Sequence, residues 1–401
     1  MDRRIIFHID VNSAFLSWTA LARLEAGDET DLRRIPSIIG GDTQKRHGIV
    51  LAKSIPAKAY GIVTGEPVVN AFRKCPVLVS AAPDHTLYKQ KSHMLMEYLA
   101  SVCPDIEQVS IDECYMDYTP IAEKYASPEQ AAATIKDQVC EQFGFTVNVG
   151  ISDRKVLAKM ASDFKKPNLV HTLYSYEIAE KMWPLPVSSL FMCGKSSVET
   201  LHKLGIVTIG DLAKADRTIL ESHLKSHGIT LWEYANGIDD SAVFPEPAKA
   251  KGVGNSTTLS ADVTDAGEAK RVLLELAESV GRRLRASRQS AELVCVEIKY
   301  HTFRSVSHQM PLPSATASDD VLYHCACRLF DDLWDGTPIR LLGLRTGKLV
   351  AEDEPVQLSL FDYQSPVSEK QKKLDAALDS IRSRFGRDAV VRASLYDADS
   401  K

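Results

Sequence analysis

The sequence predicts an α+β fold in which a larger front domain is followed by a helical region and a second, smaller α+β domain. Apolar strand-like runs are mixed with long helical patterns over residues 4–164. From residue 184 to 237 the pattern becomes helical with short loops, and strand signals return only after the polar, proline-bearing segment 236–252. Mixed strands and helices favour a sheet covered by helices, and the polar segment reads as a linker between two domains.

The front domain begins with a buried strand, because residues 4–11 form an apolar run that brings Asp10 to its C-terminal end. Asn12 and Ser13 then offer the start of a helix at Ala14. The segment 106–118 alternates and holds an acidic pair. Strands are expected at 36–41, 47–52 and 145–151, and helices at 86–102, 131–143 and 154–164, the last capped by Ser152 and Asp153.

The second domain is predicted from two helices, 268–288 and 318–334, and two strands, 291–300 and 340–349. Beyond residue 351 the acidic run 352–355 indicates disorder. Residues 368–385 then form an amphipathic helix that stops at Gly386. Its apolar stripe comprises Leu374, Ala377, Leu378, Ile381 and Phe385.

Composition indicates a soluble globular protein of two to four domains, with 401 residues, 44% hydrophobic and 25% charged. No apolar run approaches the roughly 20 residues that span a bilayer, and the N-terminus has no signal-peptide pattern. Eight scattered cysteines without C-x-x-C spacing suit reduced thiols. We therefore expect a cytoplasmic protein without membrane contact. The net charge of −5 argues mildly against nucleic-acid binding, although residues 282–288 form a basic stretch.

The adjacent acids Asp112 and Glu113 are the most informative feature of the chain, and Asp10 is a third carboxylate at a strand end. Three carboxylates brought together repel one another unless cations lie between them. Oxygen ligands of this kind suit Mg²⁺, which completes its shell with water and substrate phosphates. The pattern therefore points to metal-assisted phosphoryl or nucleotidyl transfer. Taken alone, such acids could equally be solvated surface residues at strand ends.

Five sequence blocks, in order and with sensible spacing, resemble the Y-family (translesion) DNA polymerases. The first is His8-Ile9-Asp10-Val11-Asn12-Ser13-Ala14-Phe15, and the third, Ser110 to Asp117, is similar to the family motif S-I-D-E-A-Y-L-D. The others are residues 52–61, residues 149–168 and residues 231–239. The resemblance covers roughly residues 5 to 350. It carries features of two branches, DNA polymerase IV and UmuC-like, since Lys58 and Asp10-Val11-Asn12 match the second branch.

The resemblance implies a right-hand architecture with a tethered little-finger domain. The implied palm comprises residues 1–28 and 76–165, the fingers 29–75, and the helical thumb 166–237, which holds a degenerate helix-hairpin-helix. A linker at 238–252, a little finger at 253–350 and a tail at 351–401 follow.

The resemblance also implies roles for individual residues. Asp10, Asp112 and Glu113, with the Val11 carbonyl, would hold two Mg²⁺ ions, for which Mn²⁺ could substitute. Phe15 would be the steric gate that excludes a ribose 2′-hydroxyl, and Lys58 and Lys166 would contact the triphosphate of a deoxynucleotide. Ile55 replaces a tyrosine that many members place beside the triphosphate. Contacts to primer-template DNA are expected from Gly194, Lys249, Lys251, Lys299, Arg304 and Arg340.

The tail holds Gln357-Leu358-Ser359-Leu360-Phe361, which resembles the peptide that binds the bacterial sliding clamp. In that mode Leu360 and Phe361 enter an apolar pocket while Gln357 makes a hydrogen bond. We expect a monomeric DNA-directed DNA polymerase acting at damaged templates. The alternatives are a non-catalytic, clamp-tethered Y-family scaffold that recruits other repair proteins, and a metal-dependent nuclease.

Overall fold

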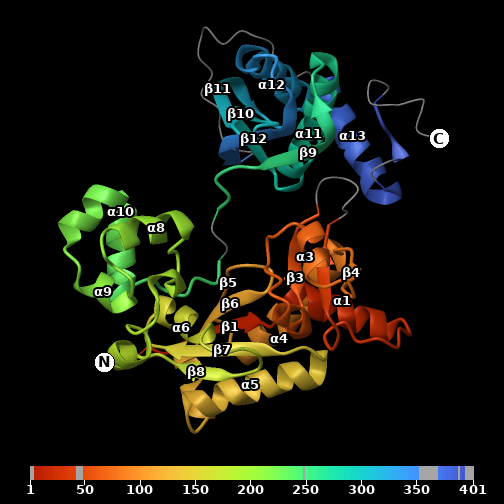
Figure 1. Cartoon of the computed structure of the whole chain (residues 1–401). Helices are drawn as coiled ribbons and strands as arrows, with labels where there is room; N and C mark the ends of the chain where they lie inside the picture. The colour runs from red at the N-terminus through yellow and green to blue at the C-terminus, as the bar shows by residue number, and fades with distance from the viewer. Residues whose placement is uncertain (1–3, 42–47, 247–248, 352–368, 387–388, 393–401) are drawn as a thin grey trace. The chain divides into compact units, whose positions relative to one another are not determined.

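The computed structural model describes residues 4–41, 48–246, 249–351, 369–386 and 389–392 (Figure 1). The chain divides into two compact units. The first comprises residues 1–43 and 48–247, and the second comprises residues 44–47 and 248–401. Each unit has its own hydrophobic core. The division at residue 247 falls inside the segment predicted as a linker.

The centre of the first unit is a five-stranded sheet with the order β5-β6-β1-β7-β8. Its strands are β1 (Ile6–Val11), β5 (Ile106–Gln108), β6 (Glu113–Asp117), β7 (Val147–Ser152) and β8 (Val170–Thr172). Neighbouring strands are antiparallel except for the parallel pair β7 and β8. Because side chains alternate along a strand, Phe7, Ile9 and Val11 point into one core, while His8 and Asp10 lie on the opposite face.

Helices cover both faces of this sheet (Figure 1). The core on one face holds residues of α1 (Ala14–Glu25), α4 (His85–Val102) and α5 (Pro128–Phe143). On the other face α6 (Lys155–Ser162) packs Ala158 against Ile6 and Tyr115. A short helix, η1 (Thr119–Lys124), follows β6. The face of the sheet that carries Asp10 therefore also faces α6.

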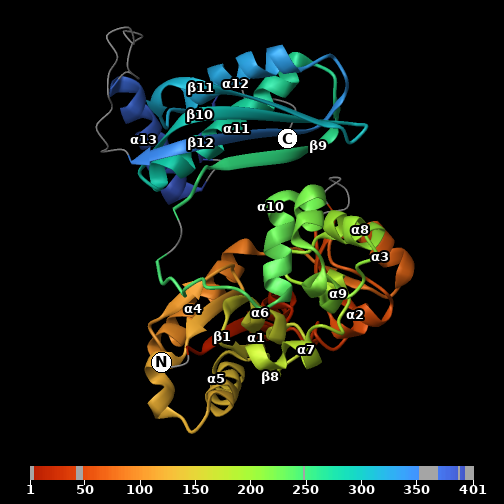
Figure 2. The same cartoon turned by 90° about the vertical axis from the view of Figure 1, so that its left-hand side faces the viewer.

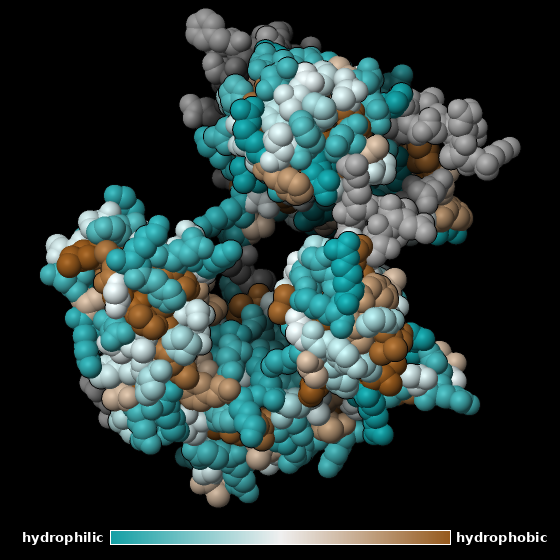
Figure 3. Space-filling view, viewed as in Figure 1, coloured by the Kyte–Doolittle hydropathy of each residue, from teal (hydrophilic) through white to brown (hydrophobic). Residues whose placement is uncertain are grey.

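The region predicted as fingers, residues 29–75, holds two helices and two strands of a small three-stranded sheet, whose third strand, β4 (Val79–Ala81), lies in the part predicted as palm. The strands β2 (Ser37–Gly40), β3 (Val50–Lys53) and β4 have the order β3-β2-β4. The helices are α2 (Ile55–Ala59) and α3 (Val68–Lys74). Ser54 caps α2 because its Oγ accepts a hydrogen bond from the Ala57 N–H at 3.0 Å, and this cap orients the turn that carries Lys58. Apolar side chains are exposed on this region, including Val69, Phe72 and Val77 (Figure 3).

The region predicted as the thumb is helical. It holds α7 (Ile178–Lys181), α8 (Lys195–Lys203), α9 (Ile209–Lys214) and α10 (Arg217–Ala235), with short helices η2 (Ser175–Glu177) and η3 (Val187–Ser189). Its core includes Val156, Leu157 and Met160 of α6. Helix α6 therefore contacts the palm sheet with one face and the thumb core with the other.

The second unit is a four-stranded antiparallel sheet, β11-β10-β12-β9, with α11 (Ala266–Ala286) and α12 (Asp319–Leu333) packed on one face (Figure 2). The strands are β9 (Gly254–Val263), β10 (Gln289–Tyr300), β11 (Ser305–Thr316) and β12 (Ile339–Ala351). Arg285 of α11 and Glu278 bind the last helix, α13 (Glu369–Phe385), through Asp379 and Arg382. Helix α13 therefore belongs to the second unit.

Several predicted elements differ from those observed. The segment 106–118 is two strands, β5 and β6, separated by a turn that holds Asp112. The predicted capping position was wrong: Arg154 is the N-cap of α6 and makes no side-chain capping hydrogen bond, and the Val156 N–H donates to Asp239 at 2.9 Å. Strands β9 and β11 were not predicted.

The apolar stripe of α13 faces solvent. The amphipathic pattern alone does not determine which face of a helix is buried. Leu374, Ile381 and Phe385 are exposed, whereas Asp375 and Arg382 are buried. The physical reason is that α13 packs against α11, whose charged side chains Arg285 and Glu278 form ion pairs with Asp375 and Arg382. The acidic run at 352–355 and the peptide Gln357–Phe361 lie outside the described residues.

Candidate active site

The three predicted carboxylates lie together at one end of the paired strands β1 and β6. Asp10 stands opposite Glu113 in the strand register. Asp112 is beside this pair, since the Val11 N–H donates to the Asp112 carbonyl at 3.0 Å. Antiparallel pairing thus joins residues that are a hundred positions apart in sequence and turns their carboxylates to a common region.

Two lysines neutralise this acidic region. Lys159 of α6 places its Nζ 2.8 Å from a Glu113 oxygen and 3.7 Å from Asp10. Lys166 places its Nζ 2.6 Å from Asp10 and 2.8 Å from Asp163. Burial lowers the pKa of Lys159, but its hydrogen bond with Glu113 and the charges of Asp163 and Asp10 outweigh burial and raise it. Both lysines are therefore held as cations beside the carboxylates.

The buried side chain of His8 contacts Glu113. Its Nε2 lies 3.3 Å from a Glu113 oxygen, and its Nδ1 is hydrogen-bonded to the Ser162 hydroxyl at 2.8 Å. Burial lowers the pKa of His8, so the ring is neutral and acts as a hydrogen-bonding group. The hydrogen bond from His8, followed by that from Lys159, lowers the pKa of Glu113 to about 2. Glu113 is thus kept ionised as an oxygen ligand.

Asp112 behaves differently from Glu113. Burial, and then the charges of Asp10 and Glu113, raise its pKa, while a 2.7 Å hydrogen bond from Ser110 opposes the shift. The two neighbouring carboxylates repel the charge of Asp112, and a divalent cation bound between them would relieve this repulsion. Among the described residues no three His, Cys, Asp or Glu side chains are gathered closely enough to hold a metal as they stand. The donor set nevertheless fits Mg²⁺, because it consists of hard oxygens whose present counter-ions are lysine side chains.

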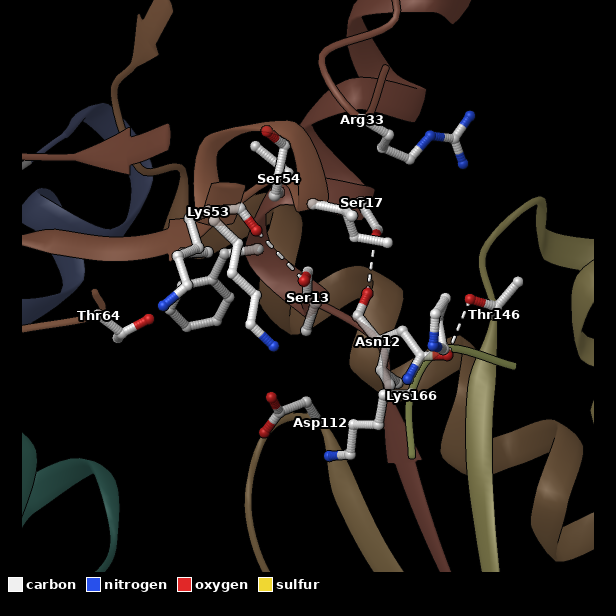
Figure 4. Close-up of a pocket in the computed structure, with 18 of the residues that line it drawn as sticks. Asn12, Ser13, Ser17, Arg33, Lys53, Ser54, Thr64, Asp112, Thr146 and Lys166 are labelled. Carbon is white, nitrogen blue, oxygen red and sulfur yellow. Dashed lines mark hydrogen bonds between the residues drawn. The ribbon is translucent and has the colours of Figure 1, made fainter. Parts of the chain in front are cut away.

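A cavity of about 750 Å³ opens beside the carboxylates and is lined by Asp10, Asp112, Phe15, Lys58 and Lys166. These are five of the predicted metal and nucleotide ligands, and Val11 lines the cavity as well. Figure 4 shows Asp112 and Lys166 on one side of it and Arg33 on the other. Its volume lies within the range typical of small-molecule sites. The cavity is also lined by Lys53, a cation that the sequence did not single out. Burial, and then the charge of Lys58, lower the pKa of Lys53.

Phe15 forms a rigid, flat wall of this cavity. Its ring stacks on that of Tyr88, with centroids 4.3 Å apart and planes 6° apart. Tyr88 is itself buried, and its hydroxyl is hydrogen-bonded to Thr19 at 2.9 Å. A half-buried aromatic ring backed in this way cannot yield easily to a larger ligand.

The remaining predicted contacts are scattered. Gly194 is the N-cap residue of α8, and two residues before it Met192 adopts a left-handed φ of +69° where the usual motif has glycine. Lys249 and Lys251 are exposed in the segment before β9. In the second unit Lys299 is on β10, Arg304 pairs with Asp335 at 3.3 Å, and Arg340 stacks on Phe303. Gln357, Leu358, Leu360 and Phe361 lie beyond the described part of the chain.

Sequence reasoning missed His8 and Lys159 as parts of this site. A signal for His8 was present, because a residue two positions before Asp10 on a strand shares its face. Lys159 precedes Asp163 by four residues, which puts both on one side of a helical turn. Only the packing of α6 on the sheet, however, brings Lys159 to Glu113.

The fold and the site define a nucleotidyl-transfer enzyme of the polymerase type, and comparisons with known proteins agree. The profile of the impB/mucB/samB family matches residues 9–163, and that of its C-terminal domain matches residues 250–360. A protein of Clostridium acetobutylicum named DNA polymerase IV is 46% identical over 99% of this chain and 100% of its own length. A DNA polymerase IV of Alkaliphilus oremlandii is 34% identical over 98% of each chain.

The chain belongs to the Y-family DNA polymerases, as its five sequence blocks predicted, and is a DNA-directed DNA polymerase of translesion synthesis. A solved structure titled Y-family DNA polymerase chimera Dbh-Dpo4(243-245)-Dbh matches with a TM-score of 0.75 and 21% identity. The match covers 86% of this chain and 99% of that one and confirms the predicted α+β right-hand fold. Nothing in the comparisons favours a scaffold or a nuclease. Among the described helices none is long and apolar enough to cross a membrane.

Proposed function

We propose that Asp10, Asp112 and Glu113, with the Val11 carbonyl, hold two Mg²⁺ ions that support transfer of a deoxynucleotide to a primer 3′-hydroxyl. The observation that carries the proposal is the pairing of Asp10 with Glu113 across β1 and β6, with Asp112 and the nucleotide-sized cavity beside them. When bound, such ions lower the pKa of the 3′-hydroxyl and neutralise the charge of the triphosphate and leaving pyrophosphate. Mn²⁺, which accepts the same oxygen ligands, could replace Mg²⁺.

The protein's own groups account for binding and orientation. Lys58 and Lys166 line the cavity and would pair with triphosphate oxygens as point charges. Lys166 now binds Asp10, so it would exchange a carboxylate for a phosphate when cations take its place. Phe15, held flat against Tyr88, would collide with a ribose 2′-hydroxyl and so admit deoxynucleotides. Positioning and electrostatics then supply most of the catalysis.

We also propose that the chain acts as a cytoplasmic monomer on primer-template DNA. Gly194 at the start of α8 would point backbone N–H groups at a phosphate. Lys249, Lys251, Lys299, Arg304 and Arg340 would contact the DNA backbone without reading sequence. The peptide Gln357–Phe361 would bind the bacterial sliding clamp and add processivity by raising the effective concentration of the enzyme at the primer.

Primer extension with Mg²⁺ tests the proposal, with wild type compared to Asp112→Ala on undamaged and damaged templates. Extension by the wild type that disappears in the variant is the expected result, since one ligand of the acidic site is lost. Equal inactivity of both proteins would instead indicate a scaffold. Shortening of the primer would indicate a nuclease.

A further inference from the structure

Two buried asparagines form a pair behind the acidic site. Asn148 is the second residue of β7 and is completely buried, and Asn12, which follows β1, is 8% exposed. The Asn12 Nδ2 donates to the Asn148 Oδ1 at 3.1 Å. In the strand register Asn148 stands opposite Asp10, on the face of the sheet that carries the carboxylates. The pair therefore lies beside Asp10, at the catalytic end of β1.

Asn148 uses its full hydrogen-bonding capacity, and three of its four partners are backbone groups. Its Nδ2 donates to the carbonyls of Ser162 and Lys165 at 3.1 and 2.7 Å. Its Oδ1 accepts from the Leu169 N–H at 3.3 Å and from Asn12. Because two partners are carbonyl oxygens, only an amide nitrogen can face them, so the orientation of this side chain is fixed.

Asn12 completes the arrangement. Its Oδ1 accepts from the Asn168 N–H at 2.9 Å and from the Thr146 hydroxyl at 2.9 Å. Thr146 immediately precedes β7, so Asn12 also ties this strand to the end of β1. Figure 4 shows Asn12 hydrogen-bonded to Thr146, with Lys166 close by.

The two amides thus hold the loop between α6 and β8 on both sides of Lys166. Ser162 and Lys165 are bound before it, and Asn168 and Leu169 after it. Loops are ordinarily the mobile parts of a fold, and a lysine side chain loses much rotational freedom when it is ordered. With the backbone fixed at four points, only the Lys166 side chain has to move when it leaves Asp10 for a ligand.

We propose that Asn12 and Asn148 are positioning residues that fix the backbone of Lys166 for binding of the incoming deoxynucleoside triphosphate. The inference rests on the proposed role of Lys166 as a triphosphate contact. Asn12 lines the cavity but Asn148 does not, so Asn148 is the residue that tests an effect passing through the loop. Its effect on the nucleotide therefore passes through the loop that carries Lys166. A substitution of Asn148 should consequently have no further effect on nucleotide binding once Lys166 has been removed.

A double-mutant cycle tests the inference by measuring the dissociation constant for the incoming nucleotide and the maximal incorporation rate in single-turnover extension. Four proteins are compared: wild type, Asn148→Ala, Lys166→Ala and the double variant. Asn148→Ala is expected to weaken nucleotide binding by about tenfold, with a smaller change in the maximal rate. The double variant is expected to bind no more weakly than Lys166→Ala alone, because residues acting through one contact are not additive.

Asn70→Ala serves as a control, since Asn70 is an exposed asparagine of α3 and should leave the dissociation constant unchanged. If Asn148→Ala fails to fold, Asn148→Thr is used in the same cycle, because a β-branched residue suits a strand but cannot reach both carbonyls.

Unchanged nucleotide binding in Lys166→Ala would overturn the proposed role of that lysine and the inference with it. Two results would overturn the inference alone while Lys166→Ala binds the nucleotide more weakly than wild type. The first is a wild-type dissociation constant in the asparagine variant. The second is a double variant in which the two single losses of affinity multiply.

Discussion

Asp10 and Glu113 lie opposite each other on two hydrogen-bonded strands, and the Lys159 ammonium contacts both, at 3.7 Å and 2.8 Å. Two carboxylates in this position repel each other, and Lys159, together with Lys166 beside Asp10, relieves the repulsion. A lysine is a suitable resident cation because its long, flexible side chain can move away when a divalent ion arrives. The relationship therefore suggests how the site tolerates its own charge without metal.

Lys159→Met should destabilise the metal-free protein. Methionine keeps the apolar stem but leaves Glu113 without one hydrogen bond and without a lysine beside it, while Lys166 still pairs with Asp10, at a cost of about 1–3 kcal/mol. Mg²⁺ should recover part of this loss because it supplies the missing positive charge. Urea unfolding with and without Mg²⁺ measures both effects, with Lys203→Met, at an exposed lysine of α8, as the control. A variant as stable as wild type without metal would contradict this account.

Phe15→Ala should relax sugar discrimination. Removing the ring opens space beside the nucleotide sugar, so the preference for deoxynucleotides over ribonucleotides should fall by about tenfold to a hundredfold. The measurement compares kcat/KM for matched dNTP and rNTP substrates. Phe72→Ala, at an exposed ring of α3, should retain wild-type discrimination. Unchanged selectivity in Phe15→Ala would remove the gate assignment.

Arg285→Met should loosen α13 from the second unit. Arg285 binds Asp319 at 2.8 Å and Asp379 at 2.6 Å, and Asp319 is 1% exposed. Removing one partner of a buried ion pair typically costs about 3–5 kcal/mol, because the other charge remains buried. Hydrogen exchange of α13 amides should accelerate in Arg285→Met. It should not accelerate in Arg271→Met, because Arg271 is an exposed arginine elsewhere on α11. Equal exchange in both would show that the ion pair does not hold α13.

Deletion of residues 357–361 should abolish binding to a bacterial sliding clamp and leave distributive primer extension intact. The physical reason is that the peptide would supply the apolar side chains for the clamp, while the proposed catalytic residues are in the first unit. Surface plasmon resonance with immobilised clamp measures the affinity. Alanine at the acidic positions 352–354 is the control. Retained clamp affinity in the deletion would place the docking site elsewhere.

The sequence predicted those parts of the site that depend on local pattern. The apolar run of residues 4–11 located Asp10 at a strand end, whereas the turn that carries Asp112 between β5 and β6 was not predicted. The asparagine pair could not be predicted in the same way, since Asn12 and Asn148 are 136 positions apart and interact only when β1 pairs with β7. An amide within a strand pattern gives no sign of its partner.

Helix α13 shows the same limit. Periodicity located an amphipathic helix at 368–385, close to the observed bounds of 369–385. It could not reveal that the charged face, with Asp375 and Arg382, is buried while Phe385 is exposed. That orientation depends on Arg285 and Glu278 of α11, which lie about a hundred residues earlier in the chain.

The most direct test of the central claim is to count Mn²⁺ ions bound by the enzyme with a primer lacking its 3′-hydroxyl and a matched dNTP, using electron paramagnetic resonance. The acidic site predicts two tightly bound ions in the wild type and the loss of at least one in Asp112→Asn, which keeps the shape of the side chain but removes its charge. The same number of ions, bound with the same affinity in both proteins, would contradict the account.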